Sequence, residues 1–214
     1  MEKFLSTAGL ICEKTSLNAT FNLIKDNYNN LIPLIITIII RAFILMSLSL
    51  YLPFEWENNL GYSVLTVGII MMVYSIFAGA SSVIGGHLAG KIGERKLLLL
   101  SFIIPLPMFL LSLNLINDHT LFSAALYILG GAIMLSAVSI SIVVAQRIVH
   151  SSPGIISGIT GGFCWGIAGF LMYPLGFLMK EYSIYNVLFY SMFLTILAFV
   201  FILFISKDVF IKAK

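Results

Sequence analysis

Six stretches of this 214-residue chain are apolar over about 20 residues each, the length that a helix needs to cross a hydrocarbon layer of roughly 30 Å. They run approximately over Leu31–Leu52, Val67–Ala89, Leu97–Leu115, Leu121–Ala145, Gly154–Met179 and Asn186–Ser206. Runs such as Leu34–Ile40 do not alternate between polar and apolar residues, as the strands of a membrane β-barrel must. The sequence therefore predicts an all-α integral membrane protein with six transmembrane helices.

The composition excludes the main classes of soluble protein. Apolar residues make up 60% of the chain and charged residues 10%, against roughly 45–50% and about 25% in a soluble domain. So few charges cannot coat a globule, and such high hydrophobicity is incompatible with disorder. Twelve basic and nine acidic residues are too scattered to form a phosphate-binding stripe, so we expect no nucleic-acid partner. The two cysteines, Cys12 and Cys164, lie far apart and give no metal-ligand spacing, so we expect no metal site.

The basic residues predict which side of the membrane each connection faces, because cytoplasmic connections carry an excess of Lys and Arg. They gather in the first segment, in the second-to-third and fourth-to-fifth connections, and in the last segment. These residues are Lys3, Lys14, Lys25, Lys91, Arg95, Lys96, Arg147, Lys207, Lys212 and Lys214. We therefore expect a multi-pass protein of the plasma membrane with both termini in the cytoplasm.

The chain divides into three predicted segments. Residues 1–30 form a cytoplasmic lead-in, residues 31–206 the six-helix bundle, and residues 207–214 a cytoplasmic tail. Apolar residues recur at helical spacing just before the first span, at Leu17, Phe21, Ile24, Tyr28 and Leu31. This spacing favours either an amphipathic helix on the cytoplasmic leaflet or a short lead-in that continues the first span.

The six spans fall into two trios, and the middle span of each trio is rich in small residues. The second span carries Ser75, Gly79, Ser82, Gly86 and Gly90, and the fifth carries Gly154, Gly158, Gly162 and Gly166. Such stripes let helix backbones approach closely. Their matched positions also predict two three-helix inverted repeats, as in secondary transporters. The alternative is simple close packing within a bundle.

Arg41 is the charged residue that most needs an explanation, because it lies about ten residues from either end of the first span, where a charge costs about 2.5–3.5 kcal/mol. It could line an aqueous cavity and bind an anionic group, or pair with a carboxylate. No Asp or Glu lies deep in any predicted span, so that carboxylate would come from a substrate or another polypeptide. The alternative is that Arg41 extends toward an interface as the helix tilts.

Three further residues are candidates for the transport cavity. Gln146, at the end of the fourth span, could hydrogen-bond across the bundle or be an ordinary polar residue at a helix end. Tyr127 and Trp165 lie within spans, where aromatic side chains either face a cavity or pack against neighbours. We retain all three, with Arg41, as predicted cavity residues.

The chain shows no arrangement typical of an enzyme. An intramembrane serine protease would need a serine on a glycine-rich helix beside a histidine base. Ser157 lies among glycines, but His87, His119 and His150 all lie outside the middle of a span. We therefore expect neither enzymatic activity nor a cofactor.

The connection between the second and third spans, from Gly86 to Lys96, carries a recognisable motif. It reads GHLAGKIGERK and resembles the cytoplasmic loop signature of the major facilitator superfamily, G-x-L-A-D-R-x-G-R-R, in its C-terminal copy. The resemblance implies a gating role for Gly86, Gly90, Lys91, Gly93, Arg95 and Lys96. The family's Asp is replaced here by Gly90, and one expected Arg by Glu94, so the latch attributed to that Asp has no counterpart at position 90.

Other segments resemble, in order and spacing, the C-terminal half of fosmidomycin-resistance-like drug efflux carriers. They are Arg41–Phe43, Leu50–Pro53, Gly61–Ser63, Val67–Gly68, Val144–Gln146 and Gly154–Gly158. The resemblance covers about residues 31–206 and implies half of a major facilitator fold. It further implies small-molecule efflux of the drug:proton antiporter kind by alternating access, with a second six-helix half or a copy of this chain as partner. A non-transporting membrane scaffold or an inactive remnant is the alternative.

Overall fold

The computed structural model describes residues 25, 27–116, 120–150 and 152–210, and this part of the chain is entirely helical and irregular, without strands. The α-helices are α2 (Tyr28–Phe54), α3 (Val64–Ile92), α4 (Glu94–Ile103), α5 (Pro105–Asn114), α6 (Thr120–Leu135), α7 (Val138–Ile148), α8 (Pro153–Ser157), α9 (Cys164–Tyr182), α10 (Ile184–Met192) and α11 (Leu194–Phe204). Two π-helical turns, η1 (Glu55–Asn59) and η2 (Gly158–Phe163), and a 3₁₀ turn, η3 (Lys207–Val209), complete the order.

The prediction of six membrane-spanning helices is confirmed. Within the described residues, six helical segments are long and apolar enough to cross a membrane: Tyr28–Asn58, Val64–Ile92, Glu94–Asn114, Leu121–Ile148, Pro153–Tyr182 and Ile184–Phe204. The last four spans each combine two or more of the elements above. The predicted amphipathic lead-in lies mostly outside the described residues, as do Cys12, His119 and the tail residues 211–214.

Short interruptions divide several spans. α4 ends before Pro105, which begins α5, because proline has no N–H to donate into the preceding turn. α6 and α7 are separated by a turn at Ser136 and Ala137. The fifth span passes through the π-helical turn η2 rather than breaking.

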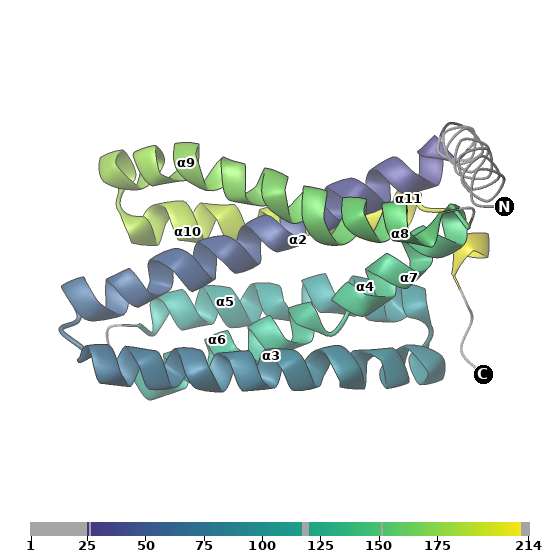
Figure 1. Cartoon of the computed structure of the whole chain (residues 1–214). Coiled ribbons are helices and arrows are strands. Elements are labelled where there is room, and N and C mark those ends of the chain that lie inside the picture. The colour runs from purple at the N-terminus through teal and green to yellow at the C-terminus, as the bar shows by residue number, and fades with distance from the viewer. Residues whose placement is uncertain (1–24, 26, 117–119, 151, 211–214) are drawn as a thin grey trace, which may run out of the picture.

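The spans pack in two layers that α4 and α7 connect (Figure 1). α2 packs against α9 and α11 in one layer, while α3, α5 and α6 pack together in the other, and α4 and α7 contact elements of both. The first span therefore packs with the fifth and sixth spans, and the fourth span packs with the second and third. Each layer thus contains two spans of one predicted trio and one span of the other. The inverted-repeat relation between the trios stays a prediction.

The end of the bundle at which α2 begins and α11 ends is called here the terminal end. The backbone N–H of Ser206, just after α11, donates to Asn30 Oδ1 in the first turn of α2 at 2.9 Å, which fixes the two segments side by side. The connection between α3 and α4 and the end of α7 lie at the same end (Figure 1). Those of the basic residues predicted to face the cytoplasm that the structure describes therefore lie at this end: Lys25, Lys91, Arg95, Lys96, Arg147 and Lys207.

The two glycine-rich spans are the least buried ones, and the glycines of their stripes leave open space where a side chain would begin. The spans Val64–Ile92 and Pro153–Tyr182 bury 11% and 28% of their most apolar segments, the smallest shares of the six. A methyl group added at any of five predicted packing positions would touch nothing within 4 Å: Gly79, Gly154, Gly158, Gly162 and Gly166. The alternative of simple close packing within the bundle therefore does not describe these five glycines, because their face of each helix points away from the other described residues. Contact with a helix of another polypeptide stays a prediction.

Close approach inside the bundle uses other glycines. A methyl group at Gly85 would overlap the backbone carbonyl of Ser136, and one at Gly131 would overlap the ring of Tyr74. Gly85 adjoins Gly86 in sequence, but one residue turns an α-helix by about 100°, so the two face different surroundings. The stripe residue Ser82 does meet α7, through a 2.8 Å hydrogen bond with Ser139.

Candidate functional site

Arg41 lies at the centre of the bundle, where α2 meets α4 and α7. Its side chain is 1% exposed, which rules out the alternative that it extends to an interface. Nη1 donates to the carbonyl of Ala137 at 3.2 Å and to Ser141 Oγ at 2.8 Å, and Nη2 donates to Ser101 Oγ at 3.4 Å. The guanidinium also lies over the ring of Phe102, with Cζ 4.8 Å from the ring centroid. Arg41 therefore connects the two layers through neutral partners.

A small void adjoins Arg41. Its volume is about 10 Å³, and its lining includes Arg41, Ser141, Thr160 and Trp165. Thr160 lies on η2 and is 1% exposed, and its hydroxyl donates to the carbonyl of Ile156 at 2.8 Å. π-Helical turns within α-helices are frequent at functional sites. The structure thus brings together two of the predicted cavity residues, Arg41 and Trp165, beside an irregular turn.

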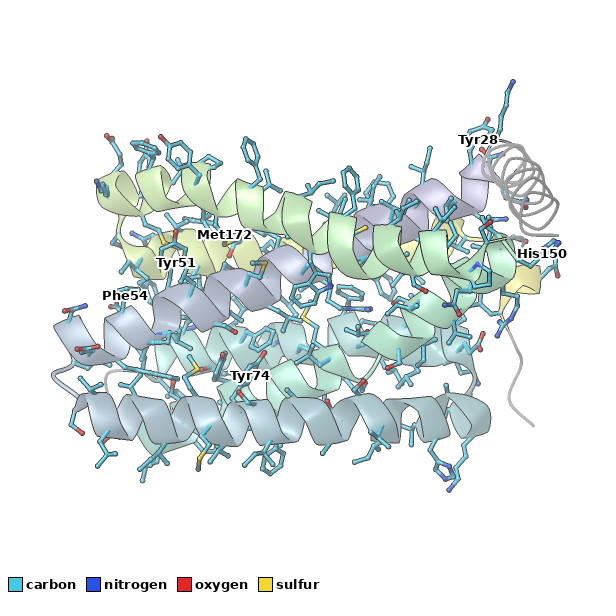
Figure 2. All side chains as sticks on the ribbon, viewed as in Figure 1. Tyr28, Tyr51, Phe54, Tyr74, His150 and Met172 are labelled. Carbon is cyan, nitrogen blue, oxygen red and sulfur yellow. The ribbon has the colours of Figure 1, made fainter. Side chains whose placement is uncertain are left out.

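Tyr127 lies in a closed aromatic cluster instead of a cavity. Its ring stacks on Tyr74 with centroids 4.8 Å apart and meets the edge of Trp56 at 5.8 Å. Its hydroxyl is 3.3 Å from Ser49 Oγ, and the residue is 1% exposed. Figure 2 shows Tyr74 reaching from α3 into the interior. α3 and η1 cover the ring in this conformation, and a cavity role of Tyr127 in transport stays a prediction.

Gln146 makes the predicted hydrogen bond across the bundle. Its Nε2 donates to Ser157 Oγ at 2.6 Å and so joins α7 to α8 at the terminal end. The Ser157 hydroxyl in turn donates to the carbonyl of Pro153 at 2.8 Å. The interaction fixes the approach of the fifth span to the fourth, whereas a role of Gln146 in transport stays a prediction.

The connection between α3 and α4 contains an ion pair that the sequence analysis missed. Glu94 Oε2 and Oε1 accept from Arg147 Nη1 and Nη2 at 2.8 and 3.0 Å, and Nη1 also donates to the carbonyl of Val209 at 3.1 Å. The side chain of Glu94 is 11% exposed and that of Arg147 is 34% exposed. Gly93 precedes Glu94 with φ of 92°, a conformation that favours glycine. The available signal was Glu94 itself, an acid where the resembled motif has a base.

The other predicted gating residues surround this ion pair. Arg95 Nη2 donates to the carbonyl of Leu203 at 3.1 Å, which joins α4 to the end of α11. Gly86, Gly90, Lys91 and Lys96 are exposed at the same end. Three elements are therefore tied together at the terminal end: the start of α4, the end of α7 and the segment after α11.

Reversing the charges of the Glu94–Arg147 pair is expected to test its contribution to stability. Glu94→Arg or Arg147→Glu alone should lower the free energy of unfolding by about 1–2 kcal/mol, because each places like charges together at a partly exposed site. The double reversal should recover most of this loss, although Glu at position 147 cannot donate to Val209. Thermal unfolding in detergent measures all four proteins, and simple addition of the two single losses would contradict a direct pair.

The larger grooves of the molecule lie elsewhere. One, of about 580 Å³, lies between α2, α9 and α10 and is lined by residues that include Tyr51, Phe54, Met172 and Lys180. Figure 2 shows Tyr51 and Met172 in the space between α2 and α9, where Tyr51 donates to the carbonyl of Met172 at 3.2 Å. A second groove of about 680 Å³ lies on the other side of α9. Neither contains Arg41, and both are mainly apolar, as expected of surfaces that face lipid.

Comparison with known proteins gives consistent matches. The family model for the Major Facilitator Superfamily matches residues 13–173. The chain is 30% identical over 151 residues to the "Fosmidomycin resistance protein" of Escherichia coli (strain K12). These 151 residues are 71% of this chain and 36% of that protein. It is 29% identical over 128 residues to the "Uncharacterized MFS-type transporter YvkA" of Bacillus subtilis (strain 168), covering 59% of this chain and 28% of that protein. The matched region thus spans about a third of each relative.

Proposed function

Because the chain belongs to the major facilitator superfamily, we propose that it forms one six-helix half of a transporter that moves a small molecule across a membrane by alternating access. The observation that carries the proposal is a helical bundle of this family whose centre holds a buried guanidinium, Arg41, that pairs with no carboxylate of the described residues. Charged side chains within spans commonly mark substrate or ion pathways. In this multi-pass membrane protein we propose Arg41, which is buried at the centre of the bundle, as such a group.

The second half is proposed to be another six-helix polypeptide or a copy of this chain. The support is the pair of glycine stripes on α3 and on the α8–α9 span, where a methyl group added at Gly79, Gly158 or Gly162 would meet no described atom within 4 Å. Small residues allow helices to approach closely in a membrane, where packing rather than water exclusion drives association. Such faces suit helices that slide against a partner as the two halves rock.

The direction of transport is proposed to be efflux through the plasma membrane, coupled to proton entry. The name of the Escherichia coli relative, a resistance protein, supports export of an antibacterial compound. The basic residues at the terminal end support a cytoplasmic location for both termini. Arg41, Trp165 and Gln146 would then line or border the transport path, and the connection from Gly86 to Lys96 would form part of the cytoplasmic gate.

Transport by the purified chain is the direct test. The chain, isolated with any polypeptide that co-purifies, is expected to catalyse saturable uptake of fosmidomycin or a related drug into vesicles that carry a proton gradient. Protein-free vesicles and vesicles without the gradient are the controls. A stoichiometric partner without transport of any compound would contradict the proposal and favour the scaffold alternative.

A further inference from the structure

The guanidinium of Arg41 has more donors than the bundle supplies with acceptors. A guanidinium carries five N–H groups, and three hydrogen bonds leave it, all from Nη1 and Nη2. Nε has no hydrogen-bond partner among the described residues. At 1% exposure, a donor without a partner costs free energy that water would otherwise offset. The described residues around Arg41 therefore lack a hydrogen-bond acceptor for Nε.

The groups that accept hydrogen bonds from Arg41 also form hydrogen bonds within their own helices. Ser141 Oγ donates to the carbonyl of Ala137 at 2.9 Å, and Ser101 Oγ donates to the carbonyl of Leu98 at 2.7 Å. The carbonyl of Ala137 also accepts from the N–H of Ser141 at 3.1 Å. Each partner therefore keeps a hydrogen bond within its own helix if Arg41 is removed. The packing of the bundle explains how the arginine is held but not what its charge is for.

No carboxylate of the described chain neutralises this charge. Glu94 pairs with Arg147 at the terminal end. The remaining described acids also lie at the ends of helices, at Glu55, Glu57, Glu181 and Asp208. A cation in the low-dielectric centre of a membrane bundle is strongly stabilised by an anion brought to it. A single bound anion would therefore supply both the acceptor that Nε lacks and the negative charge that Arg41 lacks.

The void beside Arg41 gives that anion a place to enter. At about 10 Å³ it has room for one water molecule at most, so it must widen to hold a larger group. The η2 turn that supplies Thr160 also contains Gly158, Gly161 and Gly162, and nothing described packs against these glycines. This side of the void is therefore the one that can move away from α2 with the least disruption of packing.

We propose that the void formed by Arg41, Ser141, Thr160 and Trp165 is the closed form of an oxyanion subsite, and that the transported compound carries a carboxylate, phosphonate or phosphate group. The guanidinium would bind two oxygens of that group through Nε and a free Nη2 hydrogen, since planar oxyanions match the guanidinium fork. The hydroxyls of Ser141 and Thr160 now donate to the carbonyls of Ala137 and Ile156, and they would turn from these carbonyls to donate to the bound oxyanion. This inference deepens the proposed function: that the bound anion is a transported compound rests on the chain being part of a transporter.

Trp165 gives the experiment its own reporter, because the chain has two tryptophans and only Trp165 lines the void. In a Trp56→Phe background, in nanodiscs of phosphatidylcholine, methylphosphonate and acetate are expected to change the emission of Trp165 in a saturable way. Neutral acetamide should not. Arg41→Gln should weaken the binding of methylphosphonate at least about tenfold, because a hydrogen bond to a charged group is lost. Lys207→Gln, which removes one exposed positive charge, should leave it unchanged.

The outcomes separate the possible sources of the oxyanion. A response to phosphatidylglycerol nanodiscs without any soluble anion would identify a lipid phosphodiester as the ligand and overturn the assignment to a substrate. Equal responses to acetate and acetamide in the Trp56→Phe protein would overturn the subsite even if Arg41→Gln fails to fold. Anion binding at Arg41 without transport would support the subsite and contradict the proposed function. Transport restricted to neutral or cationic compounds would support the proposed function and contradict the oxyanion subsite.

Discussion

Alanine at position 85 is expected to lower the thermal unfolding midpoint of the purified chain by about 5–10 °C. The added methyl group would overlap the backbone carbonyl of Ser136, at the turn between α6 and α7. Backbone atoms cannot rotate away as the end of a side chain can, so α3 must move off its neighbours. Because α3 packs mainly on α6, this displacement affects a large part of the contact that holds α3 in the bundle.

Gly86→Ala is the matched control for this prediction. It places the same methyl group on the next residue of the same helix, where nothing described lies within 4 Å. Alanine also favours a helix over glycine by about 1 kcal/mol, so the midpoint should stay the same or rise. Differential scanning fluorimetry in one detergent compares the two variants. Equal losses of stability would show that α3 does not pack through Gly85.

Arg41→Leu is expected to reduce transport strongly while leaving the bundle folded. Uptake of an anionic drug should fall about 10- to 100-fold, because the variant loses charge-assisted hydrogen bonds. Stability should hold or rise, since replacing a buried charge by an apolar side chain is often neutral or stabilising. The hydroxyls of Ser101 and Ser141 keep acceptors within their own helices, so no buried donor is orphaned. Few substitutions separate function from folding so clearly.

Initial uptake rates in vesicles and thermal midpoints, measured on the same preparations, test this separation. Arg41→Lys is the informative companion, because it keeps the charge but removes the planar fork. It should transport better than the leucine variant and worse than the parent chain. Unchanged uptake by Arg41→Leu would remove Arg41 from the transport path. Loss of the folded bundle would show that the arginine is structural.

Much of the fold could be predicted from the chain alone. The six spans follow from the length and apolarity of each stretch, and the predicted bounds differ from the observed ones by only a few residues. The sequence also predicts that Lys25, Lys91, Arg95, Lys96, Arg147 and Lys207 lie at one end, since an even number of spans returns the chain to the same side. The interest of Arg41 was visible because a charge in the middle of an apolar run is costly wherever the helix lies.

The neighbours of each helix were not predictable in the same way. The spacing of small residues indicates packing at Gly79 and Gly154, whereas close approach inside the bundle occurs at Gly85 and Gly131. Neither the enclosure of the Tyr127 ring nor the pairing of Glu94 with Arg147 follows from the sequence. All of these contacts depend on which face of a helix meets which neighbour. The void beside Arg41 depends on the same kind of contact.

The sequence by itself determined that this protein consists of helices that cross a membrane, how many there are, where they begin and end, and which of them carries a buried charge. Each of these properties depends on residues close together in the chain, because the cost of placing a residue in hydrocarbon is local. The tertiary structure alone decided which glycines touch a neighbour and which groups surround Arg41. In water, an apolar stripe would indicate the inner face of a helix, but lipid is as apolar as a protein interior. The hydrophobic pattern therefore does not distinguish the face toward the bundle from the face toward the membrane.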